Sequence, residues 1–197
     1  MHKRMSPHGD FDHMGEDINL VNNFKVEKVI FNCGPYNDLE SELIKALDKK
    51  KIKYYSCIKE LNIDKNKLYF LQTKEYDNEN DNSDVIYTEI NRYKFMFMGD
   101  ASITTEKEIM NKYNLPDIDV LKVGHHGSKT STGTIFYNTV KSDIAIISVG
   151  DNNIYHLSNY EIVERIKNSL TYQTNTSGSI TIKLANKKYI IYECKPY

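Results

Sequence analysis

The stretch HGDFDH, residues 8–13, places four potential metal ligands within six residues. Two of them are imidazoles and two are carboxylates, a set of donors that suits zinc, manganese or iron. A loop can fold such a cluster around one point, whereas packing alone gives no reason for this density of polar groups. The segment therefore predicts a metal site.

Three further polar groups come after apolar segments in which we expect strands. Asp100, the pair His125-His126 and His156 follow strands predicted over 93–98, 119–123 and 144–149. Together with His8 and His13, they include five of the six histidines of the chain. Because an α/β architecture gathers the groups at its strand ends on one edge of the sheet, we expect these side chains to converge.

The rest of the pattern mixes helices, strands and hairpins. Helical spacing predicts helices over 39–50, 104–113, 134–140 and 160–168, and further strands are expected over 26–31, 52–57, 67–72, 85–90, 179–184 and 189–193. The acidic, amide-rich segment 76–84 is expected to be a surface loop. With no repeat or linker to divide it, the chain is expected to form one domain over 1–197, of the α/β or α+β class with packed layers.

Composition and charge exclude several classes of protein. Apolar residues make up 40% of the 197 residues and charged residues 27%, which is ordinary for a globular domain. With 26 basic and 27 acidic residues there is no general positive field, so any contact with nucleic acid must be local. No apolar run reaches the roughly 18 residues of a membrane span. No export signal is recognisable, so the default expectation is the cytoplasm, or an extracytoplasmic location if an N-terminal segment is missing.

The three cysteines are widely spaced. Cys33, Cys57 and Cys194 form neither a disulfide framework nor a structural zinc pattern. We expect them to be three small buried thiols.

The quoted residues resemble the metal-binding signature of the metallo-β-lactamase superfamily, His-x-(His/Asp)-x-Asp-His. With Gly99-Asp100-Ala101 and the run LKVGHHGS over 121–128, they are similar to the C-terminal hydrolase domain of ComEC-type competence proteins. The resemblance covers about 8–184. It implies an αββα sandwich and a metal-dependent hydrolase, with phosphodiester hydrolysis of nucleic acid as the expected activity.

The resemblance also implies a set of metal ligands, and the positions of other residues near them give those residues further expected roles. The expected ligands of two divalent ions, zinc or manganese, are His8, Asp10, Asp12, His13, Asp100 and His125. Asp100 would bridge the ions, and metal-bound hydroxide would attack phosphorus. Asp12 and His126 are the expected catalytic residues. The expected substrate-binding residues are Ser128, Lys129, Asn153 and His156.

Three departures from the family pattern affect this interpretation. Only seven residues precede His8, which we expect to be too few for a strand and a turn, so the domain is expected to be N-terminally truncated. No histidine lies between His13 and His125, an interval in which many relatives place a ligand. The segment Tyr155-His156 lacks the glycine and proline of the family's late motif.

Two other functions stay open at this point. The same metal chemistry would serve a lactone, thioester or amide, so the expected partner is nucleic acid or a small-molecule ester. The third interpretation is a truncated, non-catalytic remnant, whose exposed strands a partner would cover.

Overall fold

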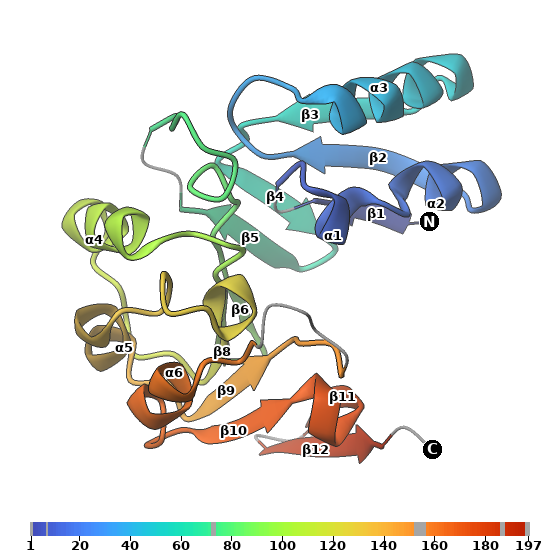
Figure 1. Ribbon diagram of the computed structural model, residues 1–197. Helices are drawn as coiled ribbons and strands as arrows, with labels where there is room; N and C mark the ends of the chain where they lie inside the picture. Colours follow the sequence, from blue (N-terminus) through green and yellow to red (C-terminus); the bar gives the residue numbers. More distant parts are fainter. Residues whose placement is uncertain (1, 7, 72–73, 152–156, 186–187, 196–197) are drawn as a thin grey trace.

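The computed structural model describes residues 2–6, 8–71, 74–151, 157–185 and 188–195. Their elements are β1 (His2–Met5), α1 (Phe11–Met14), α2 (Asp17–Asn23), β2 (Val26–Phe31), α3 (Asp38–Lys50), β3 (Lys53–Ser56), β4 (Glu60–Ile63), β5 (Asn66–Phe70), β6 (Ile86–Ile90), β7 (Tyr93–Phe97), α4 (Ile103–Lys112), β8 (Val120–Lys122), the short 3-10 helix η1 (Gly124–Gly127), α5 (Thr134–Val140), β9 (Ile144–Ile147), α6 (Tyr160–Arg165), β10 (Leu170–Gln173), α7 (Thr174–Ser177), β11 (Ser179–Ala185) and β12 (Lys188–Cys194). The strands form a three-stranded sheet β1-β2-β3, a seven-stranded sheet β10-β9-β8-β7-β6-β5-β4 and the hairpin β11-β12 (Figure 1).

The three-stranded sheet is parallel and has an apolar group on each face. Along β2, Val29 and Phe31 pack with Leu43 and Leu47 of α3, while Ile30 between them packs against the other sheet. This alternation follows from the two-residue period of a strand. A single short strand therefore contributes to two layers at once.

The expectation that no strand precedes His8 is wrong, because β1 pairs with β2 in parallel. A tight turn is not needed for this pairing. Parallel neighbours require a long crossover connection, and the segment that contains α1 and α2 supplies it. The first metal-ligand segment lies inside this crossover.

The seven-stranded sheet changes direction at β7. From β10 to β7 the neighbouring strands are parallel, and from β7 to β4 they are antiparallel. Met96, Leu121 and Ala145 belong to the cluster that includes residues of α4, α5 and α6. The residues before them in each strand, such as Phe95 and Val120, point the other way, towards the hairpin β11-β12.

The layers follow the order helix, sheet, sheet, helix. Helices α2 and α3 cover one face of the small sheet, and its other face meets β4, β5 and β6, where Ile30 packs with Leu68 and Phe70. Helices α4, α5 and α6 cover the far face of the large sheet (Figure 1). The mixed α/β class and the αββα order of layers are thus confirmed.

Most predicted elements occur within a few residues of their expected bounds. The hairpin β6-β7 turns at Asn91 and Arg92, which take positive φ angles of 52° and 74° and suit a tight two-residue turn. The sequence pattern does not predict β4 or β10. Both are short edge strands of the large sheet, and a short length is one way in which natural edges resist further pairing.

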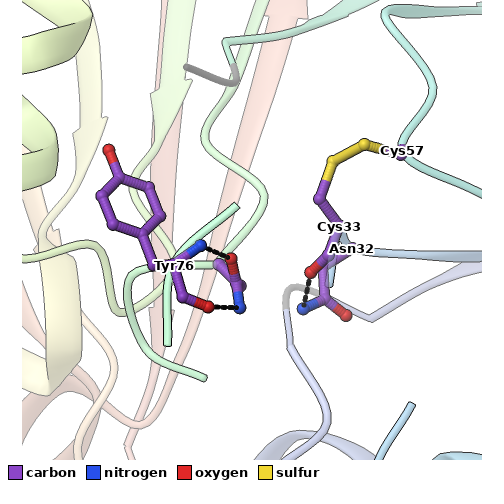
Figure 2. Close-up of a disulfide and its surroundings, with 5 residues drawn as sticks. Asn32, Cys33, Cys57 and Tyr76 are labelled. Atoms are coloured by element: carbon purple, nitrogen blue, oxygen red, sulfur yellow. Dashed lines mark hydrogen bonds between the residues drawn. A yellow bond between two sulfur atoms is a disulfide. The ribbon is translucent and has the colours of Figure 1, made fainter. Parts of the chain in front are cut away.

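The cysteine expectation is wrong in two respects. Cys33 and Cys57 form a disulfide, with a Cα–Cα distance of 4.5 Å (Figure 2). Cys194 is an exposed free thiol. Each paired cysteine lies just beyond the end of a strand, β2 or β3, and the register places Phe31 opposite Ser56. The pairing thus follows from strand order, which the spacing of the cysteines does not reveal.

None of the helices formed by the described residues combines the length and the apolar content that a membrane crossing requires.

Candidate metal centre

The first ligand segment, residues 8–13, ends in the short helix α1 and faces Asp100. His8 is fully buried, and its Nε2 atom lies 3.4 Å from Oδ2 of Asp100. His13 Nε2 lies 3.5 Å from Oδ1 of the same carboxylate. The ring centroids of His8 and His13 are 4.1 Å apart, so the two imidazoles approach Asp100 side by side.

The second ligand segment is η1, which leaves the end of β8. His125 Nε2 lies 3.6 Å from Oδ2 of Asp100, and His126 Nε2 lies 3.3 Å from Oδ2 of Asp12. Ligand atoms of four residues all lie within 4.8 Å of one another: Asp12, His13, Asp100 and His126. Three segments far apart in the sequence therefore meet at one point, as expected from their positions at strand ends.

Asp100 is the centre of the arrangement and is almost fully buried. Burial alone works against ionisation of its carboxyl group, but the close approach of the His13 and His8 rings and the nearby charge of His125 hold its pKa well below the usual range. Burial of His8 opposes protonation of its ring, yet its contact with Asp100 raises its pKa above the ordinary value. The carboxylate and its imidazoles thus stabilise each other's charged forms.

The chemistry of the donors fits a metal ion of the zinc or manganese class. The Nε2 atoms of His8, His13 and His126 are buried and have no hydrogen-bond partner within the described residues. Leaving such nitrogens unpaired is costly, and a metal ion would satisfy them. The other ring nitrogen of His126 lies 2.7 Å from the carbonyl oxygen of Ser148. A proton donated there leaves the Nε2 lone pair directed at the site, the arrangement typical of metal-binding histidines.

Asp10 occupies an outer position. Its Oδ2 atom lies 3.4 Å from Nδ1 of His8, on the side of the ring away from Asp100, and its side chain is about half exposed. This geometry suits a partner that orients the His8 ring.

The first ligand segment is held by side chains from other parts of the chain. The Gly9 N–H donates to Oε1 of Glu79 at 2.6 Å, and the Asn32 amide donates to the same oxygen at 3.1 Å. Asn37, the residue that caps α3, donates to the Gly9 carbonyl oxygen at 2.8 Å. Arg4 of β1 donates to the His13 carbonyl oxygen at 2.7 Å.

The segment 76–84 supports the centre and is only partly a surface loop. Its last three residues, Asn82, Ser83 and Asp84, are buried, which contradicts the expectation of a surface loop for that part of the segment. Ser83 Oγ accepts a hydrogen bond from the Asp100 N–H at 2.9 Å. The polar side chains of this segment are therefore used inside the protein, to satisfy the backbone N–H groups of Gly9 and Asp100.

The conformation of the second ligand segment is fixed by its own backbone angles. His125 and His126 have φ angles of 46° and 52°, in the left-handed region that costs a residue with a side chain about 1–3 kcal/mol. The flanking glycines are also needed, because a Cβ on Gly124 would overlap Ser131 and Gly127 has a φ of 81°. The glycines allow the expected bend of the backbone, and the two histidines between them also adopt left-handed backbone angles.

Glu106 of α4 fastens the loop that follows η1. Its carboxylate accepts hydrogen bonds from the backbone N–H groups of Thr132 and Gly133, and Arg165 lies close enough to interact. Burial nevertheless raises the pKa of Glu106 to about 7. Thr132 in turn accepts a hydrogen bond from the Gly124 N–H at 3.1 Å, which connects this buried carboxyl group to the histidine pair.

Comparison with known proteins tests the resemblance that the sequence motifs indicate. No family model matches the chain. It is 29% identical over 197 aligned positions to ComE operon protein 3 of Bacillus subtilis, covering 96% of this chain and 25% of that protein. It is 33% identical over 119 positions to Recombination protein 2 of Haemophilus influenzae and 31% identical over 121 positions to Competence protein ComA of Neisseria gonorrhoeae. The resemblance to ComEC-type competence proteins is confirmed. The chain spans 15% to 25% of the length of these ComEC-type relatives.

Two solved structures are weakly similar to part of this chain. The CmlA β-hydroxylase E377D mutant has a TM-score of 0.49 and 10% identity, covering 73% of this chain and 36% of its own. A putative Zn-dependent hydrolase of the metallo-β-lactamase superfamily from Thermotoga maritima has a TM-score of 0.32 and 15% identity, covering 61% and 57%. At these low scores, neither structure bears on the chemistry of the site.

Two of the four residues expected to bind substrate, Ser128 and Lys129, lie within the part of the chain that the structure describes. Ser128 Oγ lies 3.0 Å from Oγ1 of Thr130, which lies 3.3 Å from Nδ1 of His125, and Lys129 is exposed beside them. Asn153 and His156 lie outside the described residues.

Sequence reasoning gave no role to Glu79 or Glu106. Glu79 lies in the segment 76–84, in which six of the other eight residues are Asp or Asn. The sequence therefore does not distinguish Glu79 from its polar neighbours. Glu106 could have been found, because it lies three residues before the buried Ile109 on the apolar face of a predicted helix.

Proposed function

We propose that this chain is a metal-dependent hydrolase that cleaves phosphodiester bonds. The observation that carries the proposal is the group of three buried imidazole Nε2 atoms without hydrogen-bond partners in the described residues, facing Asp12 and Asp100. Bound divalent ions would supply Lewis-acid activation of water and of the phosphoryl group. Zinc and manganese both suit these donors.

The two oxygens of Asp100 support a site for two ions. Oδ1 faces His13, while Oδ2 faces His8 and His125. Asp12, His13 and His126 would hold one ion with Oδ1, and His8 and His125 would hold the second with Oδ2. Asp100 would then bridge the two positions, and Asp10 would orient His8 from outside.

Asp12 is positioned to activate the attacking water, and Lys129 is positioned to contact the phosphate. The Asp12 side chain is about half exposed, so its carboxylate can orient the attacking water and accept its proton. His126 is held by Ser148 and keeps its Nε2 atom against Asp12. Ser128 and the exposed Lys129 would contact a phosphate, with Lys129 acting as a point charge.

One observation favours nucleic acid as the substrate, and the net charge of the chain sets a condition on it. The names of the relatives refer to competence and to recombination, processes that involve DNA. The net charge of −1 requires that the positive charge for such a substrate be local, and bound ions beside Lys129 would supply it.

The test compares substrates on protein loaded with zinc or manganese. We expect hydrolysis of single-stranded DNA and of bis(p-nitrophenyl) phosphate. Asp12→Ala and His13→Ala should lower the rate by more than about 100-fold, whereas Asp77→Ala, on an exposed loop residue, should not.

Three outcomes would contradict the proposal. Activity that survives both substitutions would exclude this metal mechanism. Hydrolysis of a lactone or thioester without hydrolysis of diesters would replace phosphorus by an acyl carbon. A folded protein that binds neither metal would leave the non-catalytic interpretation.

A further inference from the structure

A cleft of about 570 Å³ opens directly beside the candidate metal centre. Asp12, His13 and His126 are among the residues that line it, so its contents would lie against the ligands. Most of its other lining side chains are apolar: Met5, Ile63, Leu68, Ile86, Ile90 and Phe97. Its volume is that of a small-molecule site, and its polar groups are few.

One cationic side chain, Lys122, is part of this apolar lining. Residue register places Lys122 opposite Phe97 on β7 and opposite Ile146 on β9, so the three share a face of the large sheet. The neighbouring Leu121 and Val123 pack on the opposite face, against the helices. The alternation along β8 therefore points the Lys122 side chain into the apolar cleft, where an apolar residue would be expected.

Lys122 has no ion-pair partner among the described residues, although the negative charge of Asp100 acts on it from farther away. Its Nζ atom donates to the Val123 carbonyl oxygen at 3.2 Å, and no carboxylate in the described part of the chain forms an ion pair with it. Burial lowers the pKa of Lys122 to about 8. An ammonium group in apolar surroundings is costly unless an anion accompanies it, and three N–H donors are available for one.

We propose that the cleft binds an uncharged aromatic substituent of a phosphodiester, such as a nucleobase, and that Lys122 Nζ contacts a phosphate oxygen of the same molecule. The proposal rests on the proposed function, and it names the substrate class. Thr88 and Asp84 also line the cleft, and their oxygens suit the N–H groups of a base better than the chain of an acyl ester. The substrate would span from the ligands into the space between the two sheets.

The test measures binding to the metal-free protein, kept in a chelator, so that it does not depend on hydrolysis. Thymidine 5′-monophosphate should bind, as followed by calorimetry. Lys122→Met should weaken this binding by about 10-fold or more, since a hydrogen bond to a charged group contributes about 1.5–3 kcal/mol. Binding of thymidine, which has no phosphate, should be unchanged.

Two further variants keep the result interpretable. Lys122→Arg should restore most of the affinity because it restores the charge, and matching thermal midpoints would show that both variants fold. Lys94→Met removes a lysine from β7, where the alternation points it to the opposite face from Phe97, and should leave binding unchanged. Phe97→Ala should weaken the monophosphate and thymidine alike.

The proposal is overturned if Lys122→Met binds the monophosphate as tightly as the unchanged protein does. It is also overturned if decanoate binds in place of the monophosphate, because the cleft would then be an acyl site. If the monophosphate binds as expected but metal-loaded protein cleaves no diester, the proposed hydrolysis fails and the assignment of the cleft stands.

Discussion

The two ligand-bearing loops of the candidate centre reach the same carboxylate by different means. The segment 8–13 has ordinary backbone angles at its helix start and is fixed from outside by Glu79, Asn37 and Arg4. The histidine pair of η1 is instead fixed by a left-handed backbone that its own strand and glycines impose. One loop depends on remote side chains and the other on local strain, so different substitutions should damage each.

The largest expected effect comes from Asp100, which both loops share. Asp100→Asn should lower zinc affinity by more than the 10- to 100-fold typical of an outer partner, because the substitution removes the charge that both sets of histidines face. Competition with a chromogenic chelator measures this. Asp143→Asn, on an exposed residue, is the control, and an equal loss in both variants would show that the effect is not local to the centre.

Glu106 should make the stability of the loop after η1 depend on pH. Because its pKa is raised to about 7, the folded protein binds a proton that the unfolded chain releases above pH 4.5. Stability should therefore rise as the pH falls from about 7 towards 4.5, by up to about 3 kcal/mol. His8, whose pKa is also raised, contributes with the same sign, so only the difference between variants is diagnostic.

Glu106→Gln should flatten the pH dependence in denaturant unfolding of the metal-free protein at pH 5, 6 and 7. Glu161→Gln, on an exposed residue of α6, should keep it. Parallel curves for the unchanged protein and Glu106→Gln would show that Glu106 does not titrate in this range.

Glu79 tests the dependence of the first loop on outside support. Glu79→Gln weakens the acceptor for the Gly9 N–H and should lower zinc affinity by about 10-fold, with a smaller effect on global stability. Asp77→Asn, in the same acidic segment, should change neither. Unchanged zinc affinity in Glu79→Gln would contradict the support that the hydrogen bonds indicate.

The smallest expected effect has opposite signs in the two loops. At His125, where φ is positive, the glycine variant should be about 1 kcal/mol more stable than the alanine variant in the metal-free protein. At His13, inside α1, glycine should be less stable than alanine by about 0.5–1 kcal/mol. Urea unfolding of the four variants measures both differences. The same sign at both positions would remove the contrast between the loops.

The convergence of the expected ligand residues was predictable from the sequence, because their residue types and their places after apolar segments are local properties. His8, His13, Asp100 and the histidine pair all come together as expected. Their supports were not predictable, because Glu79 and Asn32 meet only through tertiary structure. β1 was missed for a related reason, since a parallel strand pairs with a distant segment and leaves no turn signal beside it.

The disulfide between Cys33 and Cys57 joins the ends of β2 and β3 next to Asn32 (Figure 2). The Asn32 amide donates to Glu79. A thiol reductant would thus loosen the anchor of one loop and leave the other as it was. Reduction of the disulfide should therefore make the positions of His8 and His13 less well fixed. The conformation of the His125-His126 turn should stay the same with and without reductant.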